Sequence, residues 1–260
     1  MEEENIQIKT VEMHTGGHPL RIITSGFPLV KGNTILAKRR YIRENLDHLR
    51  KLLMFEPRGH FDMYGALLVQ PDNENADLAV IFLHNEGYST MCGHAVIALG
   101  RYAVDSGILS TDTATDGEVP IFIQCPCGVV KTMVELTEGK SGRVKFVSVP
   151  AFAFALDAEI DVENYGKLKV DIGYGGAFYA LISGEKLGVD VRSSKIKDIV
   201  EAATLVTQAA KHQIQFHHPD SEDLAFLYGT IITDGHDEFC DDPDDSTANI
   251  CVFADRQVFY

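Results

Sequence analysis

The stretch from Ser89 to Gly100 constrains the fold of this chain most, because it places a cysteine between a predicted strand and a predicted helix. The apolar run over residues 76–84 is typical of a strand. From Gly93 onward, apolar residues return at three- and four-residue spacing, the period of a helix with one buried face. The residues of this face are Val96, Ile97, Leu99, Gly100, Ala103 and Val104. Gly107 is expected to end the helix as its C-cap.

Cys92 is therefore expected at the start of this helix, where unpaired backbone N–H groups and the positive end of the helix dipole favour a thiolate. The same N–H groups bind carboxylates. A ligand carboxylate on the amides of Gly93 and His94, with the imidazole of His94 beside its amine, would fit an amino acid. This pattern favours a thiolate that removes a proton from carbon. The alternative is that Cys92 is a small apolar core residue, the usual state of a cysteine outside a disulfide.

Composition limits the class of protein. A chain of 260 residues, 45% of them apolar, can form one large domain or two modest ones with a proper core. The net charge of −15 argues against nucleic acid or an anionic membrane as a partner. No run approaches the ~18 apolar residues of a membrane span, and the acidic first residues lack the apolar region of a secretory signal. We therefore expect a cytoplasmic protein.

The cysteines and the acidic residues do not predict a metal site. The five cysteines are an odd number spread over a long chain, which is not a disulfide framework. Cys125 and Cys127 flank one proline and have no second pair at zinc spacing, so they predict a turn at a strand end. The seven acidic residues from Asp234 to Asp245 predict a solvated loop, because EF-hand spacing is absent.

The rest of the chain predicts mainly strands, with two further helices. Residues 35–54 have the helical period, with Leu46, Leu49 and Leu53 as the buried stripe, and the proline and glycine of residues 56–60 end this helix. A second helix is expected over 195–213. The predicted strands cover residues 6–12, 62–69, 120–124, 128–136, 144–149, 168–171 and, after a glycine turn, the run up to 182. Residues 13–22 are expected to form a tight loop between two strands. The pattern favours an α+β fold with a sheet around a central helix, and the order of elements repeats after residue 165.

Four segments together resemble the proline racemase family, and most closely its animal trans-3-hydroxy-L-proline dehydratases. These segments are Met13–Ile22, Glu56–His60, Met91–His94 and Gly175–Ala180. The resemblance runs in order along nearly the whole chain, and residues 218–230 are similar to the dehydratase branch. It implies a fold like that of diaminopimelate epimerase, with two similar lobes at 1–150 and 151–260. Each lobe would be a curled mixed sheet around a central helix, with the site in the cleft between them.

The resemblance also implies the chemistry. No metal or organic cofactor is expected. Cys92 matches the general base that removes the α-proton, and Gly93 and His94 match residues that hold the substrate. Tyr64 and Phe253 match aromatic positions that wall the proline ring. In a dehydratase the 3-hydroxyl then leaves as water, so the expected partner is a small imino acid such as trans-3-hydroxy-L-proline, and a homodimer is the candidate assembly.

The sequence departs from the family pattern in two places. The family's Asp-Arg-Ser-Pro motif is expected directly after Val258, and the pair Asp255-Arg256 is not that motif. The residue that separates dehydratases from racemases lies in that motif. We therefore expect an incomplete second lobe and a truncated product with little turnover. His18 stands where the family usually has an acidic residue.

Other functions stay open. A proline racemase or hydroxyproline epimerase is the nearest alternative, since the deciding position is not present. A non-catalytic binder that captures proline-like ligands through Gly93, His94 and Tyr64 is an alternative from another class. A thiol peroxidase or redox sensor built on Cys92 is disfavoured, because no resolving cysteine lies nearby in the sequence.

Overall fold

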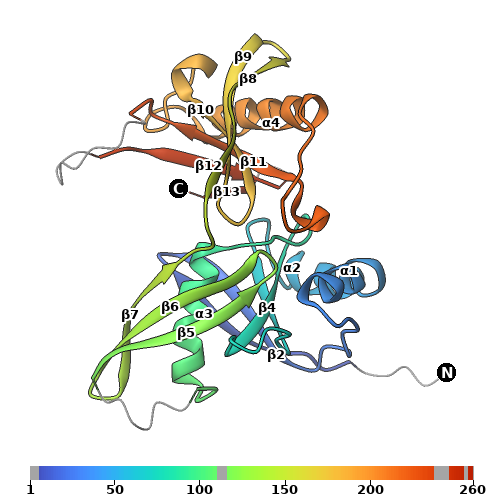
Figure 1. The fold of residues 1–260 in the computed structure, drawn as a ribbon, viewed down its shortest axis with the longest axis vertical. Helices are drawn as coiled ribbons and strands as arrows, with labels where there is room; N and C mark the ends of the chain where they lie inside the picture. Colours follow the sequence, from blue (N-terminus) through green and yellow to red (C-terminus); the bar gives the residue numbers. More distant parts are fainter. Residues whose placement is uncertain (1–5, 110–115, 237–245, 255–256, 260) are drawn as a thin grey trace. The chain divides into compact units, whose positions relative to one another are not determined.

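The computed structural model describes residues 6–109, 116–236, 246–254 and 257–259. The chain divides into two compact units, Met1–Val149 and Pro150–Tyr260 (Figure 1). In the described residues, the first unit has a mixed β-sheet with three α-helices packed on it and the second a mixed β-sheet with one, so the predicted α+β class is confirmed.

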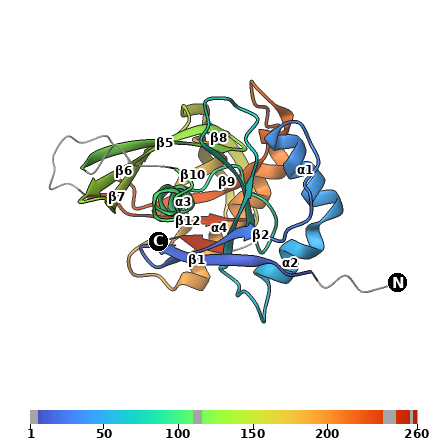
Figure 2. The same ribbon diagram turned by 90° about the horizontal axis from the view of Figure 1, so that it is seen from below.

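The first unit is built on a seven-stranded sheet with its strands in chain order. The strands are β1 (Lys9–Thr15), β2 (His18–Ser25), β3 (Tyr64–Val69), β4 (Leu78–His84), β5 (Gly117–Cys125), β6 (Gly128–Thr137) and β7 (Lys140–Val147). Helix α3 (Gly93–Asp105) contacts β1 and β2 at one end of this order and β5, β6 and β7 at the other. A helix can touch both ends only if the sheet curves around it. Figure 2 looks nearly along α3 and shows it between these two groups of strands.

Strand β4 lies at the middle of the sheet and is buried along its whole length. Ala79, Ile81 and Leu83 belong to a core cluster with Ile42 of α1 (Ile35–Asn45) and Leu53 of α2 (Asp47–Met54). Because side chains alternate across a strand, the remaining β4 residues face the other side of the sheet. The strand predicted over residues 76–84 is confirmed, and both of its faces are covered.

Helix α3 follows the predicted pattern closely. Cys92 is its N-cap, with extended backbone angles of φ −150° and ψ 111°. The helix ends at Asp105, and Gly107 lies just beyond the cap with φ +68°, a conformation that glycine adopts without strain. The buried face consists of Ala95, Val96, Ala98, Leu99, Gly100 and Ala103. Ile97 and Val104, which were predicted to be buried, are only partly so.

The prediction of a single helix over residues 35–54 is wrong. Leu46 leaves the helical region with φ −125° and ψ 13°, and separates α1 from α2. Asp47 then starts α2 with a carboxylate in its first turn, where the helix dipole favours negative charge. The break allows both helices to pack against β4. Leu49 and Leu53 are buried as predicted, and Leu46 packs against the same core from a partly buried position.

The turns of the first sheet are tighter than predicted. The predicted loop over 13–22 is instead a β-hairpin, because Thr15 pairs with His18 and leaves only Gly16 and Gly17 in the turn. Both glycines have positive φ, as a two-residue hairpin turn requires. The predicted turn at Cys125-Pro126-Cys127 is confirmed, since Cys125 pairs with Gly128.

The second unit has a six-stranded sheet in the order β13-β12-β11-β10-β9-β8. The strands are β8 (Phe152–Val162), β9 (Gly166–Tyr174), β10 (Phe178–Ser183), β11 (Leu227–Thr233), β12 (Asn249–Phe253) and β13 (Gln257–Phe259). Helix α4 (Ile196–Gln213) packs on β8, β10, β11 and β12, and short 3₁₀ helices cover Gly184–Leu187 and Glu222–Leu224. The predicted helix and the strands now labelled β9 and β10 are confirmed, whereas β8, β11, β12 and β13 were not predicted.

Some predictions fall on residues that the structure does not describe. Of the acidic run, only the part up to His236 is described, and residues 237–245 with Cys240 lie outside the described ranges, as does the pair Asp255-Arg256. No helix within the described ranges is long and apolar enough to cross a membrane.

Candidate active site

The candidate site is centred on the thiol of Cys92 in the first unit. Cys92 is 6% exposed and follows the segment that leads from β4 into α3, residues 84–91, which we name the cysteine loop. Its Sγ lies 3.2 Å from Nδ1 of His94. The two side chains that the sequence singled out are therefore in direct contact.

The other nitrogen of the His94 ring fixes the tautomer. Nε2 lies 3.2 Å from the carbonyl oxygen of Pro19 on β2. Because a carbonyl oxygen only accepts hydrogen bonds, Nε2 carries the hydrogen and donates it to Pro19. Nδ1 of the neutral ring then presents its lone pair to the Cys92 thiol. His94 is arranged as an acceptor for the thiol proton.

The surroundings of His94 keep its ring neutral. The pKa of His94 is lowered to about 4, mainly by burial; the hydrogen bond to Pro19 acts in the opposite direction, and the charge of nearby His18 makes a smaller lowering contribution. At neutral pH the ring is uncharged and retains the lone pair on Nδ1. A neutral imidazole in hydrogen-bond range can accept the thiol proton. Because its lowered pKa makes His94 a weak base, the thiolate must also be stabilised by the N–H groups at the start of α3.

Three strands hold His94 in place. The hydroxyl of Thr15 on β1 donates to the His94 carbonyl oxygen at 2.9 Å. The His18 ring at the start of β2 lies 5.6 Å from the His94 ring. The ring of Tyr64 on β3 meets His94 edge-on at 5.1 Å, and its hydroxyl is hydrogen-bonded to the Ser89 hydroxyl. The imidazole position is therefore set by the sheet as well as by its own helix.

The structure brings together four of the five predicted site residues. Cys92, Gly93, His94 and Tyr64 all belong to the first unit, and Gly93 begins α3 directly after the cysteine. A Cβ added at Gly93 would lie 3.2 Å from Cζ of Phe146 on β7, so the glycine permits a close approach of that strand. Tyr64 is 2% exposed. Phe253, the fifth, ends β12 in the second unit, 5.3 Å from the ring of Tyr228, and is described apart from the other four.

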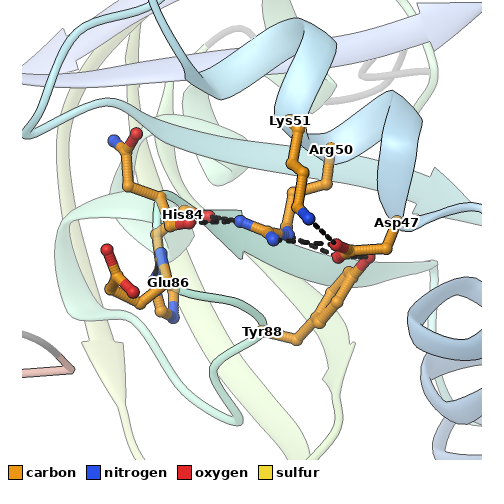
Figure 3. Close-up of polar contacts among 7 residues, drawn as sticks. Asp47, Arg50, Lys51, His84, Glu86 and Tyr88 are labelled. Carbon is orange, nitrogen blue, oxygen red and sulfur yellow. Dashed lines mark hydrogen bonds and ion pairs between the residues drawn. The ribbon is translucent and has the colours of Figure 1, made fainter.

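A second polar cluster lies behind the cysteine loop, and sequence reasoning missed it (Figure 3). Arg50 of α2 is 5% exposed, and its Nε and Nη2 donate to the two oxygens of Asp47 at 2.6 and 3.0 Å. Its Nη1 donates to the carbonyl oxygens of His84, at 2.8 Å, and Asn85. The buried cation thus joins α2 to the beginning of the cysteine loop.

The same cluster contacts the middle of the loop. The hydroxyl of Tyr88 donates to Oδ1 of Asp47 at 3.0 Å, and Nη2 of Arg39 on α1 donates to the Tyr88 carbonyl oxygen at 2.7 Å. The hydrogen bonds from Arg50 are the main reason that the pKa of Asp47 is lowered. Burial, together with the Asp47 carboxylate, raises the pKa of Tyr88, so its hydroxyl remains a donor. Basic residues on an amphipathic helix usually face solvent, so no sequence signal marked Arg50.

The remaining thiols are arranged differently from Cys92. Burial is the main cause that raises the pKa of Cys125, and the neighbouring thiols of Cys127 and Cys92 add to it. Cys125 therefore stays a thiol. Within the described ranges, no disulfide joins the cysteines, and no group of three histidine, cysteine or acidic side chains is placed to hold a metal ion.

Comparison with known proteins assigns the family. A family model described as proline racemase matches residues 10–258. The chain belongs to the proline racemase family. The resemblance found in the sequence is confirmed.

Within this family, the similar relatives include both dehydratases and an epimerase. The chain is 62% identical over 246 residues to the trans-L-3-hydroxyproline dehydratase of Saccoglossus kowalevskii, an alignment that covers 95% of this chain and 74% of the relative. It is 42% identical over 251 residues to the 3-hydroxyproline 2-epimerase of Burkholderia multivorans, covering 96% of this chain and 73% of the relative.

A solved structure has the same fold. A hydroxyproline epimerase from Agrobacterium vitis, crystallised with bound trans-4-OH-L-proline, superimposes with a TM-score of 0.85 at 24% identity. The match covers 96% of this chain and 70% of that structure. The predicted fold class is confirmed at the level of backbone architecture.

Proposed function

We propose that this chain is a trans-3-hydroxy-L-proline dehydratase that acts through Cys92. The observation that carries the proposal is the 62% identity, over 95% of the chain, to a relative named as such a dehydratase. The identity to the named epimerase is lower by 20 percentage points over a comparable length. Epimerisation is therefore the less supported alternative.

The geometry around Cys92 supports it as the base. The thiol proton passes to Nδ1 of His94, and the thiolate at the start of α3 removes the proton on C2 of the substrate. The electron pair of the broken C–H bond forms a double bond between C2 and C3. The bond from C3 to the hydroxyl oxygen breaks, and that group leaves as water with the proton that His94 took from the thiol, which restores the Cys92 thiol and the neutral imidazole. Charge that develops on the carboxylate is stabilised by the first N–H groups of the helix, each worth about 3 kcal/mol by analogy with oxyanion holes.

The other proposed site residues have separate roles. Gly93 and His94 supply helix N–H groups to the substrate carboxylate. The contacts of Tyr64 with His94 and Ser89 support a role in holding the imidazole, besides its proposed place beside the proline ring. Phe253 stays a proposed wall of the ring, on the resemblance alone. We also propose a cytoplasmic location and a homodimer, which fractionation and analytical ultracentrifugation test.

Proton NMR in deuterium oxide with trans-3-hydroxy-L-proline tests the function. A dehydratase makes the C2 and C3 proton signals of the substrate disappear together as a dehydrated ring forms. An epimerase instead exchanges the C2 proton for deuterium and leaves the 3-hydroxyl in place. However small the turnover of this chain, Cys92→Ser should abolish it and His94→Ala should lower kcat by about 100-fold. Cys127→Ser, which changes a partly buried cysteine of the β5–β6 turn, is the matched control and should retain activity.

Two results would contradict the proposal. Exchange at C2 without loss of water would make the chain an epimerase. Binding of the substrate measured by calorimetry, with no change in its NMR spectrum, would make it a binder of proline-like ligands.

A further inference from the structure

We propose that Asp47 and Arg50 of α2 are positioning residues for Cys92, and that they act through the hydrogen bonds that hold the cysteine loop against α2. The inference rests on the proposed function in one respect, namely that Cys92 is the reacting group. Figure 3 shows the contacts of Asp47 and Arg50 with the beginning and the middle of the loop.

The first step is the burial of Arg50. Its side chain is 6% exposed, while the Asp47 side chain is 28% exposed. A buried ion pair contributes little net stability, because desolvating both charges offsets their attraction, and an apolar pair of similar volume often does as well. What an apolar pair cannot supply is a hydrogen-bond donor to the carbonyl oxygens of His84 and Asn85. The guanidinium therefore fixes the loop at its first two residues.

The second step runs through Tyr88. Oδ1 of Asp47 accepts from both Nε of Arg50, at 2.6 Å, and the Tyr88 hydroxyl, at 3.0 Å. The Arg50 guanidinium also lies 5.6 Å from the centre of the Tyr88 ring. One carboxylate thus couples the beginning of the loop to a residue four positions before Cys92. Lys51 contacts the same carboxylate at 3.5 Å from a side chain that is 56% exposed, so it adds charge but no contact with the loop.

The third step leads from Tyr88 to the thiol. Ser89 is bonded to the Tyr64 hydroxyl, and the Thr90 carbonyl oxygen accepts from the Cys127 N–H at 3.2 Å. Only Met91 stands between the last of these contacts and Cys92. A shift at the start of the loop therefore moves the sulfur relative to His94 and the helix N–H groups. Misplacing a reacting group by about 1 Å costs on the order of 100-fold in rate.

Three variants separate positioning from simple stabilisation. Arg50→Gln removes the charge and the several N–H donors of the guanidinium. Arg50→Lys keeps the charge without the planar set of donors, and Tyr88→Phe removes one hydroxyl only. Lys51→Gln is the matched control, since it removes a positive charge that contacts the same carboxylate. Each purified chain is assayed for kcat and KM, for melting temperature, and for the rate at which iodoacetamide alkylates Cys92 across a range of pH, followed on its own peptide by mass spectrometry.

We expect Arg50→Gln to lower kcat by about 10- to 100-fold, with a smaller change in KM. In Arg50→Gln, iodoacetamide should alkylate Cys92 about 10-fold more slowly at pH 7, because the thiol moves away from the helix N–H groups that favour the thiolate. Arg50→Lys should recover only part of this, Tyr88→Phe should show a smaller change in the same direction, and Lys51→Gln should match the unmodified chain.

The proposal is overturned if Arg50→Gln and Tyr88→Phe lower the melting temperature but leave both the alkylation profile and kcat unchanged. Should Arg50→Gln fail to fold, Tyr88→Phe decides the question alone. If the chain has no dehydratase activity, the alkylation profile still tests whether Asp47 and Arg50 place the thiol, so failure of the positioning proposal and failure of the proposed function are distinguishable.

Discussion

His84 offers a direct test of how burial controls charge in the first unit. The residue ends β4, is 2% exposed, and its ring stacks on Tyr64. Burial lowers the pKa of His84 from 6.5 to about 3, and the positive charges of Arg50 and Arg39 contribute in the same direction. In the folded chain the ring therefore stays neutral well into the acidic range.

The size of the effect follows from linkage. Because the unfolded chain takes up the proton first, His84 contributes stability that is complete above pH 6.5 and is lost as the pH falls toward 3. At pH 5 the unfolded ring is almost fully protonated and the folded ring is not, so the loss is about 2 kcal/mol. His84→Gln should remove this dependence, because glutamine stays neutral in both states while its amide oxygen can still accept from the Glu86 N–H that His84 now binds.

Hydrogen exchange measured on the β4 peptide gives the free energy of opening at pH 8 and at pH 5. Between these values the unmodified chain should lose about 2 kcal/mol more than His84→Gln. Both chains are compared at the same pH, so intrinsic exchange rates cancel. The exposed His48 on α2 supplies the control, since His48→Gln should leave the pH dependence unchanged. An equal loss in the unmodified chain and in His84→Gln would refute the assignment of a buried neutral ring.

Two substitutions test the packing of the helices. In Gly100→Ala the new Cβ would lie 3.2 Å from Oγ1 of Thr132 and 3.3 Å from Cγ1 of Val144. We expect a net loss of about 1 kcal/mol in thermal unfolding despite the better helix propensity of alanine, and a raised melting temperature would contradict the close packing of α3 on β6 and β7. In the second unit, Thr207→Val deprives the buried Thr230 hydroxyl of a partner 2.7 Å away and should cost about 1–3 kcal/mol. Adding Thr230→Val should recover part of that cost in urea unfolding, and a further loss of stability would show that the hydroxyl pair is not the cause.

Elements with local signals were predictable from the sequence. The three- and four-residue spacing after Cys92 predicted α3, and the continuous apolar run predicted β4. The sequence did not predict strand β8, because its pairing with β9 shifts register twice, which breaks the alternation of apolar and polar residues. The sequence did not predict the break at Leu46, because the helical spacing of apolar residues continues across it. In both cases the deciding contacts are with segments distant in the sequence.

The features of the candidate site also divide into those that the sequence predicted and those that depend on tertiary contacts. The sequence alone placed Cys92 at a helix start and His94 beside it. The sequence did not show that Nε2 of His94 donates to Pro19, because that contact depends on the register of the β1–β2 hairpin, in which Thr15 pairs with His18. Nor did it show the burial of Arg50, which depends on the path of the cysteine loop over α2. Local pattern therefore pointed to Cys92 as the proposed base, whereas tertiary structure supplied the contact with Pro19 that orients His94.

The N-cap position itself separates the two interpretations of Cys92. In the described part of the chain, the sulfur makes no capping hydrogen bond to the helix, although a serine at this position typically contributes about 0.5–2 kcal/mol in that way. If Cys92 were a small apolar core residue, Cys92→Ser would bury a hydroxyl and lower the melting temperature. If the helix N–H groups are instead kept for a ligand, Cys92→Ser supplies the missing cap and should leave the melting temperature equal or higher while turnover is lost. A less stable Cys92→Ser chain would therefore favour the core interpretation, and a stable, inactive one is expected of a thiol retained for chemistry at the cost of a helix cap.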